Sequence, residues 1–187
     1  MREQLLDGAK QCLAERGYAR TTVRDIVAVS GTNLAAINYH FGSKDALLNE
    51  AMIESAGDAV REILEAGEHG DEPSTRLRAF LSSLTESFTN NRGTWATNIE
   101  ALAQALHTPE LRARIVAGQA EARAGLVDVL PAPDDDRTRR AIGAVQLTLL
   151  SGLLVQWMAD PEGAPRADEV VDGLLALAET LGGPAAT

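Results

Sequence analysis

The 187-residue sequence predicts an all-α protein. Ala, Leu, Arg and Glu are frequent, whereas Pro is sparse and aromatic residues make up only 4% of the chain. This composition favours helices over sheets. Apolar residues also recur at helical spacing in most of the chain. Together these observations predict about nine helices: three in an N-terminal head, one connector and five in a helical body.

The first helix is predicted from about Arg2 to Arg16, and Gly17 is suited to end it. Its apolar stripe consists of Leu5, Leu6, Ala9, Cys12 and Leu13. Cys12 is interpreted as a small buried hydrophobe. As the single cysteine it cannot form an internal disulfide, and the charged N-terminal residues do not resemble a signal peptide. Both features indicate a cytoplasmic protein.

A second, short helix is predicted after Thr22, because Thr22 and Asp25 approximate a capping box. Val23, Ile26 and Val27 are expected to face inward. The stretch from Ser30 to Asn33 reads as a turn, in which Gly31 supplies the backbone freedom for a tight bend. Thr32 or Asn33 is expected to cap the next helix.

The third helix is predicted from Leu34 to about His40, with Leu34, Ile37 and Phe41 on its buried edge. The opposite edge is expected to present Asn33, Ala35, Ala36, Asn38 and Tyr39. That edge is small, polar and uncharged. Such a surface can approach a base edge closely, and Asn can pair with adenine through two hydrogen bonds. The helix pair therefore predicts a helix-turn-helix that reads DNA.

The fourth helix is predicted to begin at the Ser43 N-cap and to run to about Ala66, linking the head to the body. Lys44 lies in its first turn, where the helix dipole disfavours a cation. The placement is explained if the ammonium and the free backbone N–H groups converge on a phosphate. The alternative is a solvated lysine with a small energetic penalty.

Five body helices are predicted at about 74–90, 94–106, 109–130, 136–158 and 167–181. The loops between them are expected at 67–73, 90–93, 131–136 and 160–166. The run from Ala141 to Ala159 carries no charge and is long enough to cross a membrane, but polar residues interrupt it. A helix buried in protein on most sides is the favoured interpretation.

Charge is distributed unevenly. The chain has a formal net charge of −10. Residues 1–50 contain six Lys or Arg and six Asp or Glu, so the whole acidic excess lies in residues 51–187. Because an acidic body repels a polyanion, any DNA surface is expected on the first fifty residues.

Catalytic and metal chemistry are not predicted. No plausible nucleophile has the spacing to use His40 as a base. Three His and one Cys, without metal-ligand spacing, supply too few ligands for a metal site. We therefore expect neither an enzyme nor a cofactor.

The segment from Leu5 to Leu48 closely resembles the tetracycline-repressor (TetR) family. The resemblance is carried by Thr22, Arg24, Ile26, Gly31, Leu34, Ile37, Tyr39, His40, Phe41, Lys44 and Leu47. Departures from the usual family residues occur at Val27, Ser30, Thr32, Ala35 and Asn38. These positions bear on the choice of operator more than on whether DNA is bound.

The resemblance implies a function and a division of the chain. Residues 1–47 would form the DNA-binding domain, with the connector from about residue 43, and residues 48–187 the ligand-binding and dimerisation domain. Family members are homodimers, here through the helices at about 137–158 and 167–181. They bind a palindromic DNA operator and are released by a small molecule.

The resemblance also assigns contacts. Thr22, Tyr39, His40 and Lys44 match phosphate contacts of the family. Arg24, Thr32, Asn33, Ala35, Ala36 and Asn38 are candidates for contact with bases or backbone.

An effector cavity is expected between the first four body helices. Its apolar walls would be Phe80, Leu84, Phe88, Trp95, Ile99, Leu102 and Trp157, and its polar groups Asn98, Glu100, Gln104, His107 and Gln146. Each of these is open to the simpler interpretation of ordinary core or surface. An apolar or aromatic small molecule is the default expectation, and nothing in the sequence identifies the compound.

Two functions remain open from the sequence. One is a ligand-responsive transcriptional repressor in the cytoplasm. The other is an all-helical small-molecule-binding or enzymatic domain in which the N-terminal unit only packs. The uncharged edge of the third helix and the placement of Lys44 favour the first.

Overall fold

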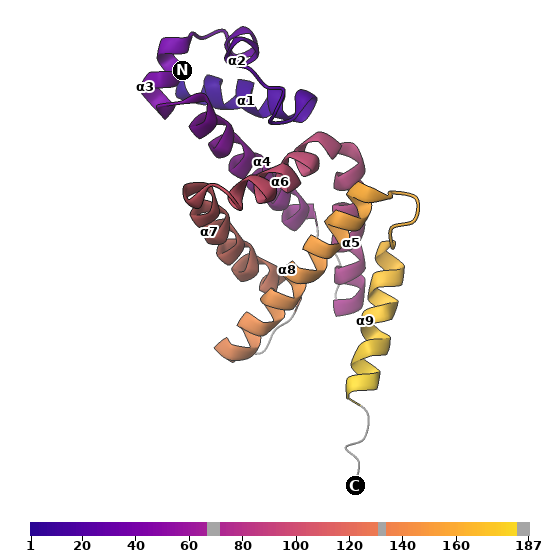
Figure 1. Ribbon diagram of the computed structural model, residues 1–187. Helices are drawn as coiled ribbons and strands as arrows, with labels where there is room; N and C mark the ends of the chain where they lie inside the picture. Colours follow the sequence, from indigo (N-terminus) through magenta and orange to yellow (C-terminus); the bar gives the residue numbers. More distant parts are fainter. Residues whose placement is uncertain (67–71, 131–133, 183–187) are drawn as a thin grey trace. The chain divides into compact units, whose positions relative to one another are not determined.

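The computed structural model describes residues 1–66, 72–130 and 134–182, and these contain only helices and their connections (Figure 1). The α-helices are α1 (Arg2–Arg16), α2 (Val23–Ser30), α3 (Leu34–Phe41), α4 (Lys44–Ala66), α5 (Pro73–Asn90), α6 (Arg92–Ala105), α7 (Pro109–Leu126), α8 (Asp136–Ala159) and α9 (Ala167–Leu181). A short 3-10 helix, η1 (Val127–Val129), follows α7. The all-α prediction is confirmed.

The chain forms two compact units. The first comprises Met1–Arg61 and Asn90–Ala122, and the second Glu62–Thr89 and Arg123–Thr187. The first unit therefore contains α1 to α3, most of α4, α6 and most of α7. These units describe backbone packing only, so the functional division near residue 47 stays a prediction.

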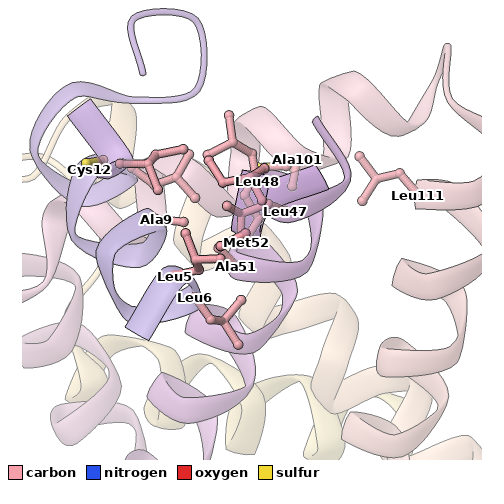
Figure 2. Close-up of a cluster of buried hydrophobic side chains, with 14 of the residues drawn as sticks. Leu5, Leu6, Ala9, Cys12, Leu47, Leu48, Ala51, Met52, Ala101 and Leu111 are labelled. Atoms are coloured by element: carbon pink, nitrogen blue, oxygen red, sulfur yellow. The ribbon is translucent and has the colours of Figure 1, made fainter. Parts of the chain in front are cut away.

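The core of the first unit is built around the apolar stripe of α1. Leu5, Ala9 and Cys12 have no exposed surface, and Leu13 is almost fully buried. They pack against a buried stripe of α4 that consists of Leu47, Leu48, Ala51 and Met52 (Figure 2). Ala101 and Leu111 bring α6 and α7 into the same cluster. This core fixes the short helices α2 and α3 on a rigid support.

Helix α6 lies very close to the end of α1. A methyl group on Gly93 would collide with the carbonyl oxygen of Ala14. One turn later, the Thr97 hydroxyl donates to the carbonyls of Gly93 at 2.9 Å and Leu13 at 3.3 Å. The two helices therefore meet along a surface that has no room for a larger residue at Gly93.

The second unit is organised around α5. Phe80, Leu81, Leu84 and Phe88 are buried along this helix, and the Phe88 ring centroid lies 6.4 Å from that of Trp157 on α8. The Arg78 guanidinium bridges α5 to α9 by pairing with Asp168 at 2.8 Å and Asp172 at 2.6 Å.

The largest differences between the predicted and the observed helix boundaries concern α6 and α7. Helix α6 begins at Arg92, so Gly93 lies inside its first turn and not in the preceding break. The helix predicted from 109 to 130 ends at Leu126 and continues as η1, where Val127 and Val129 are buried in the second unit. The predicted loops at 67–73 and 131–136 fall mostly outside the described residues.

Burial of α8 also differs from expectation. By length and composition α8 is the one helix of the described residues that could cross a membrane, but only 17% of its apolar window is buried within the chain. The expected burial on most sides is therefore wrong for a single chain. A long apolar surface remains uncovered on this helix.

The contact between α6 and α1 gives a prediction about stability. Gly93→Ala is expected to lower the free energy of unfolding by about 1–3 kcal/mol, because the added methyl must displace backbone. Gly118→Ala on α7 is the matched control, since nothing lies within 4 Å of its added methyl. It is expected to raise the free energy of unfolding by about 0.5–1 kcal/mol. Urea unfolding followed by circular dichroism measures both, and equal effects would refute the steric account.

Candidate nucleic-acid interface

The N-terminus of α2 is closed by a reciprocal capping box. The Asp25 backbone N–H donates to the Thr22 hydroxyl at 3.3 Å, and the Asp25 carboxylate accepts from the Thr22 backbone N–H at 2.9 Å. Arg16 pairs with the same carboxylate at 2.9 Å. The hydrogen bonds from Thr22, followed by the charge of Arg16, lower the pKa of Asp25. The predicted capping box is confirmed, and it leaves Thr22 exposed at the start of the helix.

The outer face of α3 is small and uncharged. Asn33, Ala35, Asn38 and Tyr39 are exposed, and Tyr39 is 85% exposed. The Asn33 side chain caps α3 by accepting from the Ala36 backbone N–H at 2.9 Å. Its amide NH₂ group is not used in this bond. Asn33, and not Thr32, is therefore the N-cap, while the Thr32 hydroxyl lies 2.7 Å from that of Ser30.

Two residues of α3 lie on the opposite side from their predicted positions. Leu34 is 52% exposed, although it was expected on the buried edge, and Ala36 is only 6% exposed, although it was expected outside. The buried arc is centred on Ala36 and Ile37. At about 100° per residue, Leu34 points roughly 110° away from that centre. The exposed face therefore gains Leu34 and loses Ala36.

Tyr39 and His40 form an aromatic pair at the end of α3. Their ring centroids are 4.9 Å apart in an edge-on arrangement, and the Phe41 ring follows at 6.4 Å from that of His40. His40 is half-buried. Tyr39 thus projects from the unit beside a ring that fixes its direction.

The Lys44 ammonium is held against the turn between α1 and α2. Its Nζ atom donates to the Thr21 carbonyl at 3.3 Å and lies 5.9 Å from the centroid of the Tyr18 ring. Asp45 lies 3.7 Å from the same atom. The Lys44 side chain remains 32% exposed, and the Ser43 hydroxyl caps α4 by accepting from the Ala46 N–H at 3.0 Å. Lys44 is therefore directed by its neighbours and still accessible.

Sequence reasoning missed the part played by the turn of residues 17–21. Thr21 is almost fully buried, and its hydroxyl donates to the carbonyls of Gly17 at 2.8 Å and Cys12 at 3.3 Å. Burial, and then the charge of Asp45, raise the pKa of Tyr18. The nearest sequence indication was the pair of threonines before α2, of which only the second was assigned a role.

The other basic groups of the head differ in availability. Arg20 and Arg24 are exposed, and the Arg20 Nε atom donates to the Arg16 carbonyl at 2.8 Å. Arg2 pairs with Glu50, and its guanidinium lies 5.2 Å from the centroid of the Phe41 ring. Its charge is thus partly compensated within the protein.

Comparison with known proteins assigns the family. Residues 5–51 match the family described as bacterial regulatory proteins, tetR family. Residues 73–181, more than half of the chain, match the C-terminal region of BetI-type transcriptional repressors. The chain belongs to the TetR family.

Relatives of this TetR-family chain are transcriptional regulators. It is 32% identical over 115 residues to the HTH-type transcriptional regulator BetI of Stenotrophomonas maltophilia, covering 59% of this chain and 57% of that protein. It is 36% identical over 66 residues to the HTH-type transcriptional repressor AcnR of Corynebacterium efficiens, covering 35% of each. The matched part thus spans little more than half of the first relative and about a third of the second.

Solved structures share the fold. A TetR-family transcriptional regulator from Rhodococcus sp. superposes with a TM-score of 0.72 at 20% sequence identity, covering 96% of both chains. At this identity the likeness concerns the arrangement of helices only.

The residues predicted to line an effector cavity are distributed over both units of this TetR-family chain. Phe80, Leu84, Phe88, Gln146 and Trp157 belong to the second unit, and Trp95, Asn98, Ile99, Glu100, Leu102, Gln104 and His107 to the first. In the second unit, the Gln146 side-chain oxygen is buried without a hydrogen-bond partner, and the Trp157 indole N–H donates to the Pro165 carbonyl at 3.1 Å.

On α6 the same set divides by exposure. Trp95 is buried and Asn98 and Ile99 are half-buried, whereas Leu102, Gln104 and His107 are exposed. The Glu100 carboxylate accepts from the Tyr18 backbone N–H at 2.7 Å. Glu100 thus contacts the turn that follows α1 in the N-terminal head.

The described residues contain no group of three or more His, Cys, Asp or Glu arranged to hold a metal ion. Cys12 is fully buried, and this burial, followed by the charge of Asp25, raises the pKa of its thiol.

The capping box makes the stability of the head depend on pH. Because the folded pKa of Asp25 lies below its ordinary value of 3.8, the capped carboxylate stabilises the fold above that pH. The stabilisation is lost as the pH falls from 3.8 through the folded pKa. Asp25→Asn is therefore expected to unfold at lower denaturant concentration than wild type at pH 7, with the gap closing below pH 3.8.

Denaturant unfolding of the two proteins from pH 7 to pH 2.5 measures this gap. Asp7→Asn, at an exposed position of α1, controls for the loss of one negative charge. A gap that stays constant with pH would show that Asp25 does not act through its charge.

Proposed function

We propose that this chain is a ligand-responsive transcriptional repressor that binds a palindromic operator as a homodimer and is released by a small molecule. The observation that carries the proposal is the exposed, uncharged face of α3, which in the sequence follows the exposed Thr22 cap and precedes the accessible Lys44 ammonium. The match of residues 5–51 to the TetR family supports the same assignment.

The outer face of α3 would enter the major groove. Ala35 leaves room for close approach, and Asn33 and Asn38 carry amide groups that can pair with base edges. Leu34, which the structure exposes, adds an apolar group suited to contact with a thymine methyl. Arg24 lies on α2, and Thr32 lies in the turn between α2 and α3. Both would contact bases or the DNA backbone. Ala36 is buried and would act by letting α3 pack closely.

Phosphate contacts would come from groups at the margins of that face. Lys44 supplies a directed ammonium at the N-terminus of α4, where backbone N–H groups also favour an anion. Thr22 is the N-cap of α2, and Tyr39 and His40 lie at the end of α3. Because the face of α3 carries no charge, these margins would provide most of the affinity and its dependence on salt.

The division of labour follows the charge. Residues 1–47 would bind DNA, with α4 as the connector, and the acidic residues 48–187 would bind the effector and dimerise. Such a body repels DNA, which restricts binding to the head. We place the protein in the cytoplasm, where both its operator and its effector are accessible.

The homodimer would form through α8 and α9. Both helices expose large apolar side chains: Val145, Leu149 and Val155 on α8, and Leu175, Leu177 and Leu181 on α9. An apolar pocket lined by residues of α5, α8 and α9 includes Leu149 and Gly152, and nothing lies within 4 Å of a methyl group added to Gly152. A second copy would cover this surface, and small residues would let the helices approach closely.

The effector would be a small apolar or aromatic molecule bound within the body. Phe80, Leu84, Phe88 and Trp157 supply apolar and aromatic surface, and the buried, unpartnered oxygen of Gln146 is an acceptor for a polar group of the ligand. Selection of bound duplexes from a random pool, repeated with candidate metabolites, tests both operator binding and release.

Lys44→Ala is expected to weaken binding to all duplexes, selected or random, by a similar factor. The plot of log affinity against log salt should become shallower by about one unit, because one phosphate contact is lost. Fluorescence anisotropy at several salt concentrations measures both quantities.

Arg61→Ala is the matched control for Lys44→Ala. Arg61 is an exposed cation of the same helix, about 25 Å further along its axis. It should leave affinity and slope unchanged. If the two variants behave alike, Lys44 is not a phosphate contact.

Val155→Glu is expected to shift the protein from dimer to monomer in sedimentation, because a carboxylate would be buried without a partner in the dimer. Val116→Glu, on α7 of the other unit, is matched to it, since both valines are 56% exposed. The control should remain dimeric. A monomeric wild type, or a dimeric Val155→Glu, would contradict the proposed interface.

A further inference from the structure

We propose that Glu100 on α6 is a positioning residue for Lys44, acting through the turn of residues 17–21. The proposal rests on the DNA-binding function proposed above, because it concerns the group that would contact phosphate. It assigns to α6 a direct connection with the DNA-binding head that passes through α1 and not along α4.

The connection begins at the Glu100 carboxylate. One of its oxygens accepts the Tyr18 backbone N–H at 2.7 Å. The other would lie 3.0 Å from a methyl group added to Gly17, whose φ of +75° turns the chain out of α1. Because Gly17 donates its own N–H back to Leu13 at 2.8 Å, the Tyr18 N–H is the first after α1 that depends on another helix. A carboxylate is a strong acceptor for it.

The turn then holds Lys44. Within the turn, the centroid of the Tyr18 ring lies 5.9 Å from the Lys44 Nζ atom, and the Thr21 carbonyl accepts a hydrogen bond from the same atom at 3.3 Å. The buried Thr21 hydroxyl ties the far end of the turn back to Gly17 at 2.8 Å. Both ends of the turn are thus fixed, so displacing Tyr18 displaces the groups that direct the Lys44 ammonium.

Helix α6 is well placed to move this turn. Gly93, Thr97 and Glu100 repeat at spacings of four and three and so share one face of α6. All three touch the end of α1 or the residues directly after it: Gly93 at Ala14, Thr97 at Leu13 and Glu100 at Tyr18. Since no methyl fits between Gly93 and Ala14, a movement of α6 toward α1 would displace the end of α1. A shift of α6 therefore reaches Lys44 as a shift of the turn.

Two variants separate the hydrogen bond from the charge. Glu100→Ala removes the acceptor and the charge, whereas Glu100→Gln removes only the charge and keeps an oxygen that can accept from Tyr18. Gln104→Ala, at an exposed position one turn later on α6, controls for a general change in the helix.

The first readouts need no DNA. In the free full-length protein, Glu100→Ala is expected to speed hydrogen exchange of the Tyr18 amide about tenfold or more and to shift the side-chain NMR signals of Lys44. Glu100→Gln and Gln104→Ala should change neither. An unchanged Tyr18 exchange rate or unchanged Lys44 signals in Glu100→Ala would overturn the proposal, whether or not the protein binds DNA.

The second readout is affinity for a duplex selected from a random pool. Glu100→Ala is expected to weaken binding about three- to tenfold, and Glu100→Gln to bind as tightly as wild type or tighter. In the Lys44→Ala background Glu100→Ala should cause no further loss, since its effect passes through Lys44. Additive losses would overturn the proposal. A wild type that binds no duplex would refute the proposed function, while the NMR result would still decide the link from Glu100 to Lys44.

Discussion

The burial of α1 is the constraint on which the head of this protein depends. Its stripe from Leu5 to Leu13 is covered by α2, α3, α4 and α6 at once. Full burial of each leucine of this stripe contributes about 1.5–3 kcal/mol, whereas an isolated eight-residue helix is marginal on its own hydrogen bonds. Helices α2 and α3 therefore hold their shape because α1 supports them. The direction of the α3 face is a consequence of that packing.

The support that α1 gives also explains how a head with few available positive charges could bind a polyanion. Residues 1–50 carry no net charge, and Arg2 and Arg16 pair with Glu50 and Asp25. Affinity cannot then come from a broad basic surface. It has to come from single groups held in place, and Lys44 is held by a carbonyl, a ring and the start of a helix. Each of those neighbours belongs to a segment that α1 fixes.

Sequence reasoning predicted what local chemistry determines and missed what distant packing determines. The capping box of Thr22, a cap at Thr32 or Asn33 and the ends of α1 and α9 depend on residues within one turn, so the sequence alone indicates them, and the structure then selects Asn33 as the cap. The exposure of Leu34 depends on which side of α3 packs against the core. The three apolar residues of this short helix, Leu34, Ile37 and Phe41, do not determine that side. The hydrogen bond from the Tyr18 backbone N–H to the Glu100 carboxylate joins residues far apart in the chain. No pattern in the residues around either position indicates that they meet.

The apolar run of α8 has three explanations that its composition cannot distinguish and that the structure can. A core helix, a membrane helix and an interface helix can share one hydropathy profile. A core helix is excluded for the single chain by the exposure of α8. The following helix α9 carries charged residues such as Asp172 and Glu179 as well as the exposed Leu175 and Leu177, a composition suited to a soluble surface. An interface between protein chains needs exposed apolar side chains, and both α8 and α9 carry them. The proposed dimer would cover this exposed apolar surface.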